Sequence, residues 1–426
     1  MNQTAGRRRG SKLLEPRRWV GIAAFSGALA VGLAAGGAAG LWARGAPRAD
    51  VPGPAGALPG YAQRTPTTHP VVPDTMLAWT PNGLPPGFAR RVSALPGVAR
   101  AVPVVSGIAW LTQTTDDLVV RRPPRGFAYP IEVAGAALDR YAAFMAPGDR
   151  PLLAGLRTGG GLLGQSSARL RGVGPGQSAS LTFRAPPGHR SPVVVPVAGI
   201  VPDTAVGANE LFVSWRTAAR LGLHTQRYVL IDPAPGVPRD RLSARIRRLV
   251  PADMPLRIRG PGETPYFRQG DAVLPQVRMK ELFGEFASRP EPGGRLDIDP
   301  GWISRHIVTT RVPLLGVVRC NRAVVPQLRG ALSELEASGL GQLVNPQQYG
   351  GCFSPRFTNR IPNAGISHHA WGAALDINVA ANAYGRPPTQ DHRLVAIFAR
   401  WGFTWGGRFL IPDGMHFDFI RYGSGS

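Results

Sequence analysis

The sequence predicts an α+β protein with two folded domains that follow an N-terminal apolar segment. Its 426 residues exceed what a single hydrophobic core usually organises, so we expect two domains. Residues 98–111 and 193–201 are β-rich runs bounded by Pro, Gly and Asp, whereas residues 88–95, 215–221 and 242–250 have the apolar spacing of amphipathic helices. These elements do not alternate regularly enough to predict a doubly wound parallel sheet.

The chain is strongly basic, with a formal net charge of +23, and its arginines are scattered along its length. A charge of this size could serve nucleic acid, anionic lipid or another polyanion. We find no nucleic-acid-binding motif and no run of Lys or Arg beyond the N-terminus, so no nucleic-acid partner is expected. A polyanionic cell envelope is the preferred partner, and coding bias toward arginine is the alternative explanation for part of the excess.

Residues 1–18 and 19–42 predict a membrane anchor. The first segment is basic, and the second has no charged residue and a tryptophan at each end. About 20 apolar residues suffice for a helix to cross the hydrocarbon core, and basic residues favour the cytoplasmic side. We therefore expect a single-pass transmembrane helix in the cell membrane, with everything after about residue 45 on the extracytoplasmic side. A cleaved signal peptide, whose apolar region is shorter, is the alternative.

Composition divides the exported part of the chain into a linker and two domains. Residues 43–70 are rich in Pro, Gly and Ala and predict a linker. Residues 71–275 are expected to form the first α+β domain and residues 279–426 the second, although a Pro- and Gly-rich stretch at 290–294 also marks a boundary. A glycine cluster at 159–164 lacks the Lys-Ser/Thr ending of a phosphate-binding loop and is interpreted as an ordinary loop.

The two cysteines of the chain, Cys320 and Cys352, both lie in the exported part. A pair of cysteines in an oxidising compartment predicts a disulfide, which would contribute roughly 3–4 kcal/mol in the chain-entropy model. Two thiolate ligands of a zinc ion are the alternative. That alternative is weaker because the Cys-x-x-Cys spacing of such sites is absent.

Two short segments of the second domain carry the residues of most chemical interest. Residues 374–379 alternate so that Leu, Ile and Val share one face while Asp376 lies on the other. The run 415–419 behaves alike and puts His416 on its polar face. If the two strands lie side by side, Asp376 and His416 can reach one metal ion, and His369, just before a glycine turn, can complete the set.

Two neutral imidazoles and one carboxylate make the three-ligand set of a hydrolytic zinc site, which keeps an open position. Zinc held in this way stays positively charged and can acidify a water molecule. A second carboxylate must then move the proton to the leaving group, and Asp413, three residues before His416, is placed for that role. A cation is also needed for the oxyanion or a substrate carboxylate, with Arg356 as the first choice and Arg360 in reserve.

Several of these residues have a structural alternative. The Asp-Gly pair of the expected base favours a turn on its own, and Arg356 could be ordinary surface charge. Asn378 and Asp418 are interpreted as structural. Trp401 and Trp405 could line a substrate groove, but core packing is at least as strongly expected.

The spacing of these residues resembles that of one known family, the zinc D-alanyl-D-alanine carboxypeptidases of the vancomycin-resistance type. The matching residues here are Ser367-x-His369-x-x-Gly372-x-Ala374-x-Asp376 and Asp413-x-x-His416. The resemblance covers roughly residues 280–423. It extends to phage L-alanyl-D-glutamate endopeptidases and, for the fold of the metal site, to the hedgehog signalling domain. It implies an α+β domain whose small antiparallel sheet carries the site.

The family resemblance also implies roles for these residues. One Zn²⁺ would be held by His369, Asp376 and His416, with Asp413 as the base and Arg356 as the arginine of the site. The substrates would be peptidoglycan stem peptides. The dipeptidase branch of the family has Glu at the base and the endopeptidase branch has Asp, so the bond that is cleaved stays open between the two. A metal-containing binding protein without hydrolytic activity, as in the hedgehog case, is the alternative.

The first domain resembles the extracytoplasmic domain of macrolide-exporter-type ABC permeases. The resemblance covers roughly residues 75–270 and rests on segments 97–104, 166–176 and 197–203. In that family the domain contacts partners or senses, which implies an envelope protein as a partner of this chain. No permease helices follow it here, so an adaptor to an envelope complex and a plain spacer are both open.

Overall fold

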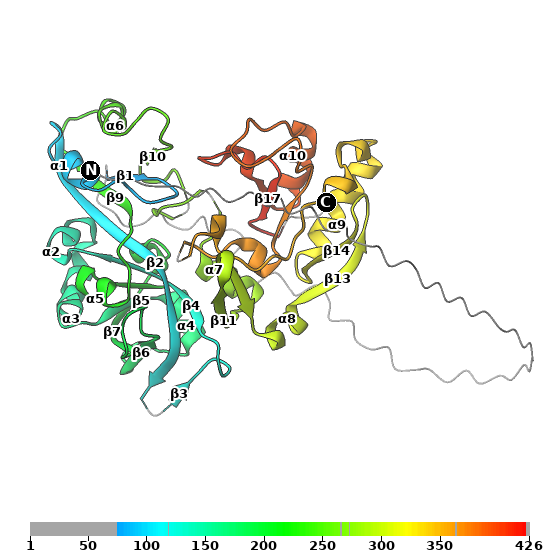
Figure 1. Ribbon diagram of the computed structural model, residues 1–426. Coiled ribbons are helices and arrows are strands. Elements are labelled where there is room, and N and C mark those ends of the chain that lie inside the picture. Colours follow the sequence, from blue (N-terminus) through cyan, green and yellow to red (C-terminus); the bar gives the residue numbers. More distant parts are fainter. Residues whose placement is uncertain (1–74, 118, 265, 272, 363, 423–426) are drawn as a thin grey trace, which may run out of the picture. The chain divides into compact units, whose positions relative to one another are not determined.

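The computed structural model describes residues 75–422 with the exception of 118, 265, 272 and 363 (Figure 1). The predicted basic tail, membrane anchor and linker lie outside these residues. Within the described range, every helix is too short or too polar to cross a membrane. The structure confirms the predicted mixture of helices and strands.

A ten-stranded sheet dominates the first half of the described chain. Its strands are β1 (Met76–Trp79), β2 (Val98–Asp116), β3 (Val119–Arg121), β4 (Tyr129–Ala136), β5 (Gly161–Gly164), β6 (Ala179–Phe183), β7 (Val193–Val201), β8 (Leu211–Ser214), β9 (Gln226–Pro233) and β10 (Arg257–Arg259). The order is β10-β1-β9-β2-β4-β8-β5-β7-β6, with β3 beside β2. The long strand β2 also pairs with β6, so six of the strands close into a ring.

Short helices connect these strands. They are α1 (Phe88–Ser93), α2 (Leu138–Tyr141), α3 (Leu153–Arg157), α4 (Gln165–Arg171), α5 (Trp215–Arg220) and α6 (Arg239–Arg247). The helices predicted at 88–95 and 215–221 end within two residues of these bounds, whereas the helix predicted at 242–250 begins and ends three residues earlier.

The interpretation of the glycine cluster at 159–164 as a loop is wrong, because its last four residues form the buried strand β5. A Cβ atom at Gly161 would lie 2.7 Å from Cδ1 of Leu211, in the neighbouring strand β8. Packing of β5 against β8 therefore requires a residue without a side chain at this position. Glycines add nothing to a pattern of apolar residues, so β5 cannot be recognised from such a pattern.

The C-terminal part of the chain has small sheets and four helices in its described residues. The helices are α7 (Gln276–Phe283), α8 (Pro300–His306), α9 (Val325–Ala337) and α10 (His392–Arg400). The strands are β11 (Ser288–Glu291), β12 (Arg295–Ile298), β13 (Ile307–Val312), β14 (Gly316–Asn321), β15 (Ala374–Asp376), β16 (Phe403–Trp405) and β17 (His416–Phe419). The last three form one antiparallel sheet in the order β15-β17-β16.

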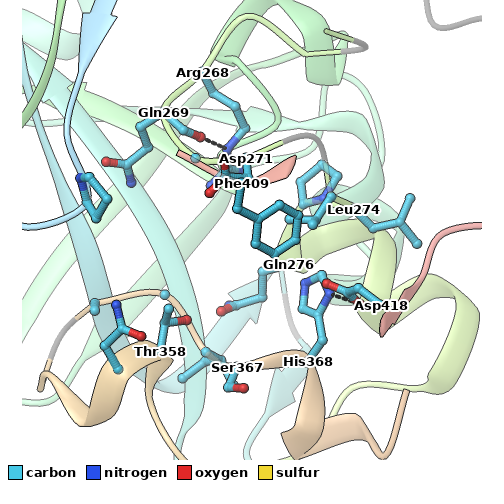
Figure 2. Close-up of a pocket in the computed structure, with 18 of the residues that line it drawn as sticks. Arg268, Gln269, Asp271, Leu274, Gln276, Thr358, Ser367, His368, Phe409 and Asp418 are labelled. Carbon is cyan, nitrogen blue, oxygen red and sulfur yellow. Dashed lines mark hydrogen bonds and ion pairs between the residues drawn. The ribbon is translucent and has the colours of Figure 1, made fainter. Parts of the chain in front are cut away.

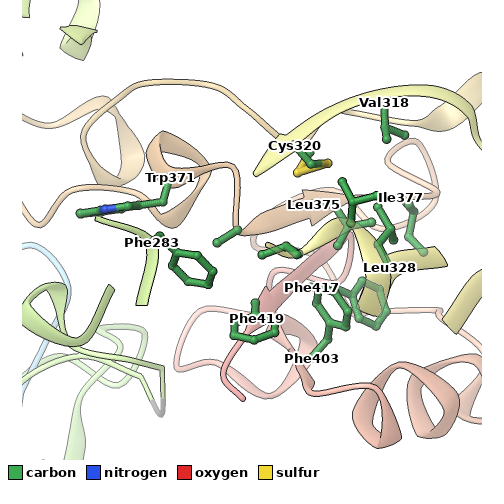
Figure 3. Packing of buried hydrophobic residues seen from close by; sticks show 14 of the residues in the cluster. Phe283, Val318, Cys320, Leu328, Trp371, Leu375, Ile377, Phe403, Phe417 and Phe419 are labelled. Atoms are coloured by element: carbon green, nitrogen blue, oxygen red, sulfur yellow. A yellow bond between two sulfur atoms is a disulfide. The ribbon is translucent and has the colours of Figure 1, made fainter. Parts of the chain in front are cut away.

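Aromatic side chains fill the core beneath this three-stranded sheet (Figure 3). Phe417 of β17 packs against Phe398 of α10 with 4.6 Å between ring centroids, and Phe403 meets Phe419 edge to face at 5.9 Å. The expected disulfide between Cys320 and Cys352 is present and borders the same core. The three-stranded sheet is thus supported by a packed core on the side opposite its polar face.

Candidate metal centre

Strand pairing brings two of the expected ligands together. In the antiparallel register of β15 and β17, Asp376 lies directly opposite His416. Neighbouring residues on paired strands project to the same face, as the alternation of each segment predicts. Strand β15 ends at Asp376, however, so the strand predicted from the alternation up to residue 379 is longer than the observed one. Asn378 adopts a left-handed backbone with φ of 54° and bonds to Leu343 and Gln390, which makes it a structural residue.

The third expected ligand, His369, comes from the short 3-10 helix His368–Trp371. That helix ends at Gly372, whose φ of 64° lies in the left-handed region. A Cβ atom there would approach the backbone nitrogen of Asn321 to 2.7 Å, so glycine is required by both conformation and space. The turn directs the chain from the histidine into β15 and so fixes the spacing between His369 and Asp376.

These three side chains converge closely enough to hold one metal ion. Their nearest ligand atoms all lie within 4.8 Å of one another. Nε2 of His369 is 3.3 Å from Oδ2 of Asp376, and Nδ1 of His416 is 3.1 Å from Oδ1 of Asp376. The two imidazole nitrogens are 3.2 Å apart. Two nitrogens and one carboxylate oxygen in this arrangement fit a catalytic transition-metal site with open positions.

Hydrogen bonds orient both imidazoles from behind. His369 donates from Nδ1 to the backbone carbonyl of Cys352 at 2.9 Å, which leaves Nε2 free to act as a ligand. On the other ring, Nε2 of His416 lies 3.6 Å from the buried carboxylate of Asp418. Asp418 also accepts a hydrogen bond from Nδ1 of His368 at 2.7 Å. His368 and Asp418 are therefore supporting residues of the site.

The electrostatics of the three side chains reflect their burial and mutual contact. Burial lowers the pKa of His369, which favours the neutral imidazole that a metal needs. Burial opposes ionisation of Asp376, but its interactions with His369 and His416 outweigh this and lower its pKa. Burial also opposes the charge on His416, but Asp376 and Asp418 outweigh it and raise the pKa to about 10. A metal ion must displace that proton, so its binding weakens as the pH falls.

Asp413, the expected base, lies in the turn that enters β17. The turn is closed by a hydrogen bond from the backbone N–H of His416 to the carbonyl of Asp413 at 3.1 Å. Its side-chain oxygen Oδ1 is buried and has no hydrogen-bond partner among the described residues. Burial raises the pKa of Asp413. A turn-forming role alone would not place an unpaired carboxylate beside the three converging side chains.

The two arginines considered for the site differ in position. Arg356 is partly buried and lines the same cavity as His369 and Asp413. Burial lowers its pKa, while the charges of Asp376 and Asp413 act in the opposite direction. Arg360 is exposed and lines a separate surface hollow with Arg289 and neighbouring residues. The structure thus places Arg356 at the site and Arg360 outside it.

A cavity of about 270 Å³ opens onto the site (Figure 2). It is lined by Asp413, His416 and Phe409 together with residues of the ten-stranded sheet and of the loop before α7. Neither Trp401 nor Trp405 lines it. Their indole nitrogens donate instead to Glu334 and to the backbone of Gly414, so both tryptophans serve packing.

Comparison with known proteins gives a family for the C-terminal part of the chain. Residues 361–419 match the family described as D-alanyl-D-alanine carboxypeptidase. The match spans His369, Asp376, Asp413 and His416, and it confirms the resemblance drawn from their spacing. This part of the chain is therefore similar to a cell-wall peptidase. None of the curated proteins matches the chain.

Solved structures resemble the central part of the chain. The periplasmic region of MacB from Actinobacillus actinomycetemcomitans is 12% identical with a TM-score of 0.28, over 45% of this chain and 90% of that one. The extracellular domain of the ABC-type transporter YknZ from Gram-positive bacteria is 12% identical with a TM-score of 0.27, over 44% of this chain and 100% of that one.

Proposed function

We propose that this chain is a zinc-dependent peptidase that cleaves peptidoglycan stem peptides, with His369, Asp376 and His416 as the metal ligands. One observation carries the proposal. Three ligand atoms converge within 4.8 Å in the cavity that Asp413 also lines, and the buried Oδ1 of Asp413 has no hydrogen-bond partner among the described residues. The similarity of residues 361–419 to D-alanyl-D-alanine carboxypeptidases supports the same chemistry.

Zinc bound by two imidazoles and a carboxylate would supply Lewis acidity, since it polarises a carbonyl and lowers the pKa of a water molecule. Asp413 accepts the proton of the attacking water and passes it to the nitrogen of the leaving amine. Burial raises the pKa of Asp413, which makes its carboxylate a better proton acceptor than an exposed one. Arg356 binds the negative charge that develops on the substrate or the carboxylate at its C-terminus.

The expected place of action follows from the N-terminal sequence. A basic segment before an uncharged apolar stretch of membrane-spanning length favours a single-pass anchor with the peptidase on the cell-wall side. A disulfide between Cys320 and Cys352 is consistent with an oxidising compartment. We therefore assign the peptidase to the extracytoplasmic side of the cell membrane, where stem peptides are accessible.

The family description favours the D-alanyl-D-alanine bond as the one that is cleaved. Aspartate rather than glutamate at position 413 keeps the L-alanyl-D-glutamate bond as the second choice. Mass spectrometry of purified muropeptides after incubation with the zinc-loaded protein distinguishes the two, because loss of one alanine and scission within the stem give different masses.

The test of the function compares the wild type with Asp413→Asn and with Asp297→Asn as a matched control. Asp297 of β12 forms a solvent-accessible ion pair with Arg289 of β11. Loss of the base is expected to lower the cleavage rate by about 10²–10⁴-fold, while the control retains the wild-type rate. Wild-type cleavage by Asp413→Asn, or full activity after removal of the metal by a chelator, would overturn the proposal.

A further inference from the structure

The cavity of the metal centre does not end within the peptidase-like segment. Trp79 of β1, Arg227 of β9 and Arg259 of β10 line it from the ten-stranded sheet. Figure 2 shows Arg268 and Gln269 across the cavity from Ser367 and His368, with the ring of Phe409 between them. These sheet residues fall outside residues 361–419, which match the peptidase family. Their presence in the cavity is therefore a property of this two-domain chain.

Arg259 brings a desolvated positive charge to this wall. Its side chain is buried, and among the described residues its hydrogen bonds go to the backbone carbonyls of Arg268 and Gly270 rather than to a carboxylate. Burial and the charge of Arg257 lower its pKa to about 10, although Asp271 and Glu263 act in the opposite direction. Arg268, by contrast, is neutralised by two hydrogen bonds to the carboxylate of Glu132.

Two buried polar atoms of residues that line the cavity lack hydrogen-bond partners within the described part of the chain. They are Nε1 of Trp79, which is a donor, and Oε1 of Gln276, which is an acceptor. Trp79 is only 3% exposed and Gln276 only 4%. The side-chain amide of Gln276 is held in this orientation, because its nitrogen donates hydrogen bonds to the carbonyl of Pro130 and the carboxylate of Glu210. A buried polar group of this kind destabilises the folded chain unless a ligand satisfies it.

The geometry of Trp79 and Arg259 favours one kind of ligand. The guanidinium carbon of Arg259 lies 5.3 Å from the centroid of the Trp79 ring, and Nε1 of that ring has no hydrogen-bond partner among the described residues. A carboxylate satisfies both, because it accepts hydrogen bonds at two oxygens and carries the opposite charge. The free oxygen of Gln276 suits an amide N–H of the same molecule.

We propose that the ten-stranded sheet and the start of α7 form a second subsite of the cavity, in which Arg259 and Trp79 bind a carboxylate of the peptide substrate and Gln276 accepts one of its backbone N–H groups. This inference rests on the proposed peptidase function, since it assumes that a peptide enters the cavity. The carboxylate belongs to the part of the peptide remote from the scissile bond, because Asp413 and Arg356 occupy the part near the metal centre. This second subsite is then a specificity element of the enzyme.

The test measures binding rather than turnover. Two peptides ending in D-alanyl-D-alanine are used, which differ only in whether a glutamate residue before the scissile bond carries a free carboxylate or a carboxamide. Calorimetry with the metal-depleted full chain is expected to show about tenfold tighter binding of the carboxylate form. Arg259→Gln and Trp79→Phe should reduce this preference, and Arg259→Lys should retain part of it. Arg241→Gln on the exposed face of α6 is the matched control.

Equal binding of the two peptides by the wild type would overturn the inference, as would an unchanged preference in Trp79→Phe. The latter variant guards against misfolding of Arg259→Gln, because it keeps the aromatic ring and removes only the indole N–H. Cleavage of both peptides by the zinc-loaded protein without any preference would leave the peptidase function intact and remove the subsite. Preferential binding without cleavage would keep the subsite and remove the peptidase function.

Discussion

Lys280 and Glu210 form an ion pair in which neither side chain is exposed, with 2.7 Å between Nζ and Oε1. Lys280 belongs to α7, at the start of the C-terminal part, and Glu210 directly precedes β8 of the large sheet. Arg171 of α4 and Glu285 complete a buried cluster of alternating charge. The cluster fastens the helix that leads into the peptidase-like part to the ten-stranded sheet.

Removal of one partner of this cluster should be costly. Lys280→Ala leaves buried carboxylates short of a counter-charge, so the free energy of unfolding is expected to fall by about 3–5 kcal/mol. Urea denaturation followed by tryptophan fluorescence measures the change. Asp139→Asn, which breaks the exposed ion pair with Arg157, is the control and should cost no more than about 1 kcal/mol. An unchanged urea midpoint for Lys280→Ala would contradict the assignment.

The same cluster predicts a pH dependence of stability. Burial opposes ionisation of Glu285, but Arg171 and Lys280 outweigh it and lower its pKa from 4.5 to about 2. A depressed folded-state pKa stabilises the protein above the unfolded value, and this contribution is lost as the pH falls from about 4.5 through about 2. Urea midpoints of the wild type and Glu285→Gln should therefore differ most near neutral pH and converge toward pH 2. A constant difference across this range would be the opposing result.

Asp418 is expected to tune the metal site without contacting the ion. It holds His368 at 2.7 Å and lies beside Nε2 of His416, so Asp418→Asn weakens the support of one ligand. The loss of such a supporting carboxylate typically lowers metal affinity about 10–100-fold. Competition with a chromogenic chelator measures the affinity, and Asp297→Asn serves as the surface control. Equal affinities for the two variants would show that Asp418 only packs.

Arg356 and Arg360 offer a matched pair for the role of the cation. Arg356→Ala removes a charge that faces the cavity and should lower kcat/KM by about 10²–10³-fold. Arg360→Ala removes an exposed charge outside the cavity and should leave kcat/KM near the wild-type value. Steady-state kinetics on a stem peptide, with circular dichroism to check folding, compares them. The reverse ranking would exchange the two assignments.

The alternation of polar and apolar residues predicted the parts of the site that depend on strand geometry. Strand alternation put Asp376 and His416 on polar faces, and their pairing in β15 and β17 brings them opposite each other. The role of Asp418 could have been found from the same alternation, since it lies two residues beyond His416 on that face. Its contact with His368 depends on a turn fifty residues away, which no periodicity reveals.

The features that the sequence did not predict depend on distant contacts. Glu210 and Lys280 are seventy residues apart in the chain, and the sequence around neither residue indicates that the two form an ion pair. Strand β5 was missed because its glycines have no side chains to form a pattern. The wall of the cavity made by Trp79 and Arg259 likewise arises only when β1 and β10 pair at the edge of the sheet.

The hydrogen bond from His369 to the carbonyl of Cys352 links formation of the disulfide to the orientation of a candidate metal ligand. That carbonyl belongs to a half of the disulfide bridge, so the bridge fixes the acceptor that aims the imidazole. Oxidation of the two thiols should therefore precede high-affinity binding of a metal ion by His369, Asp376 and His416.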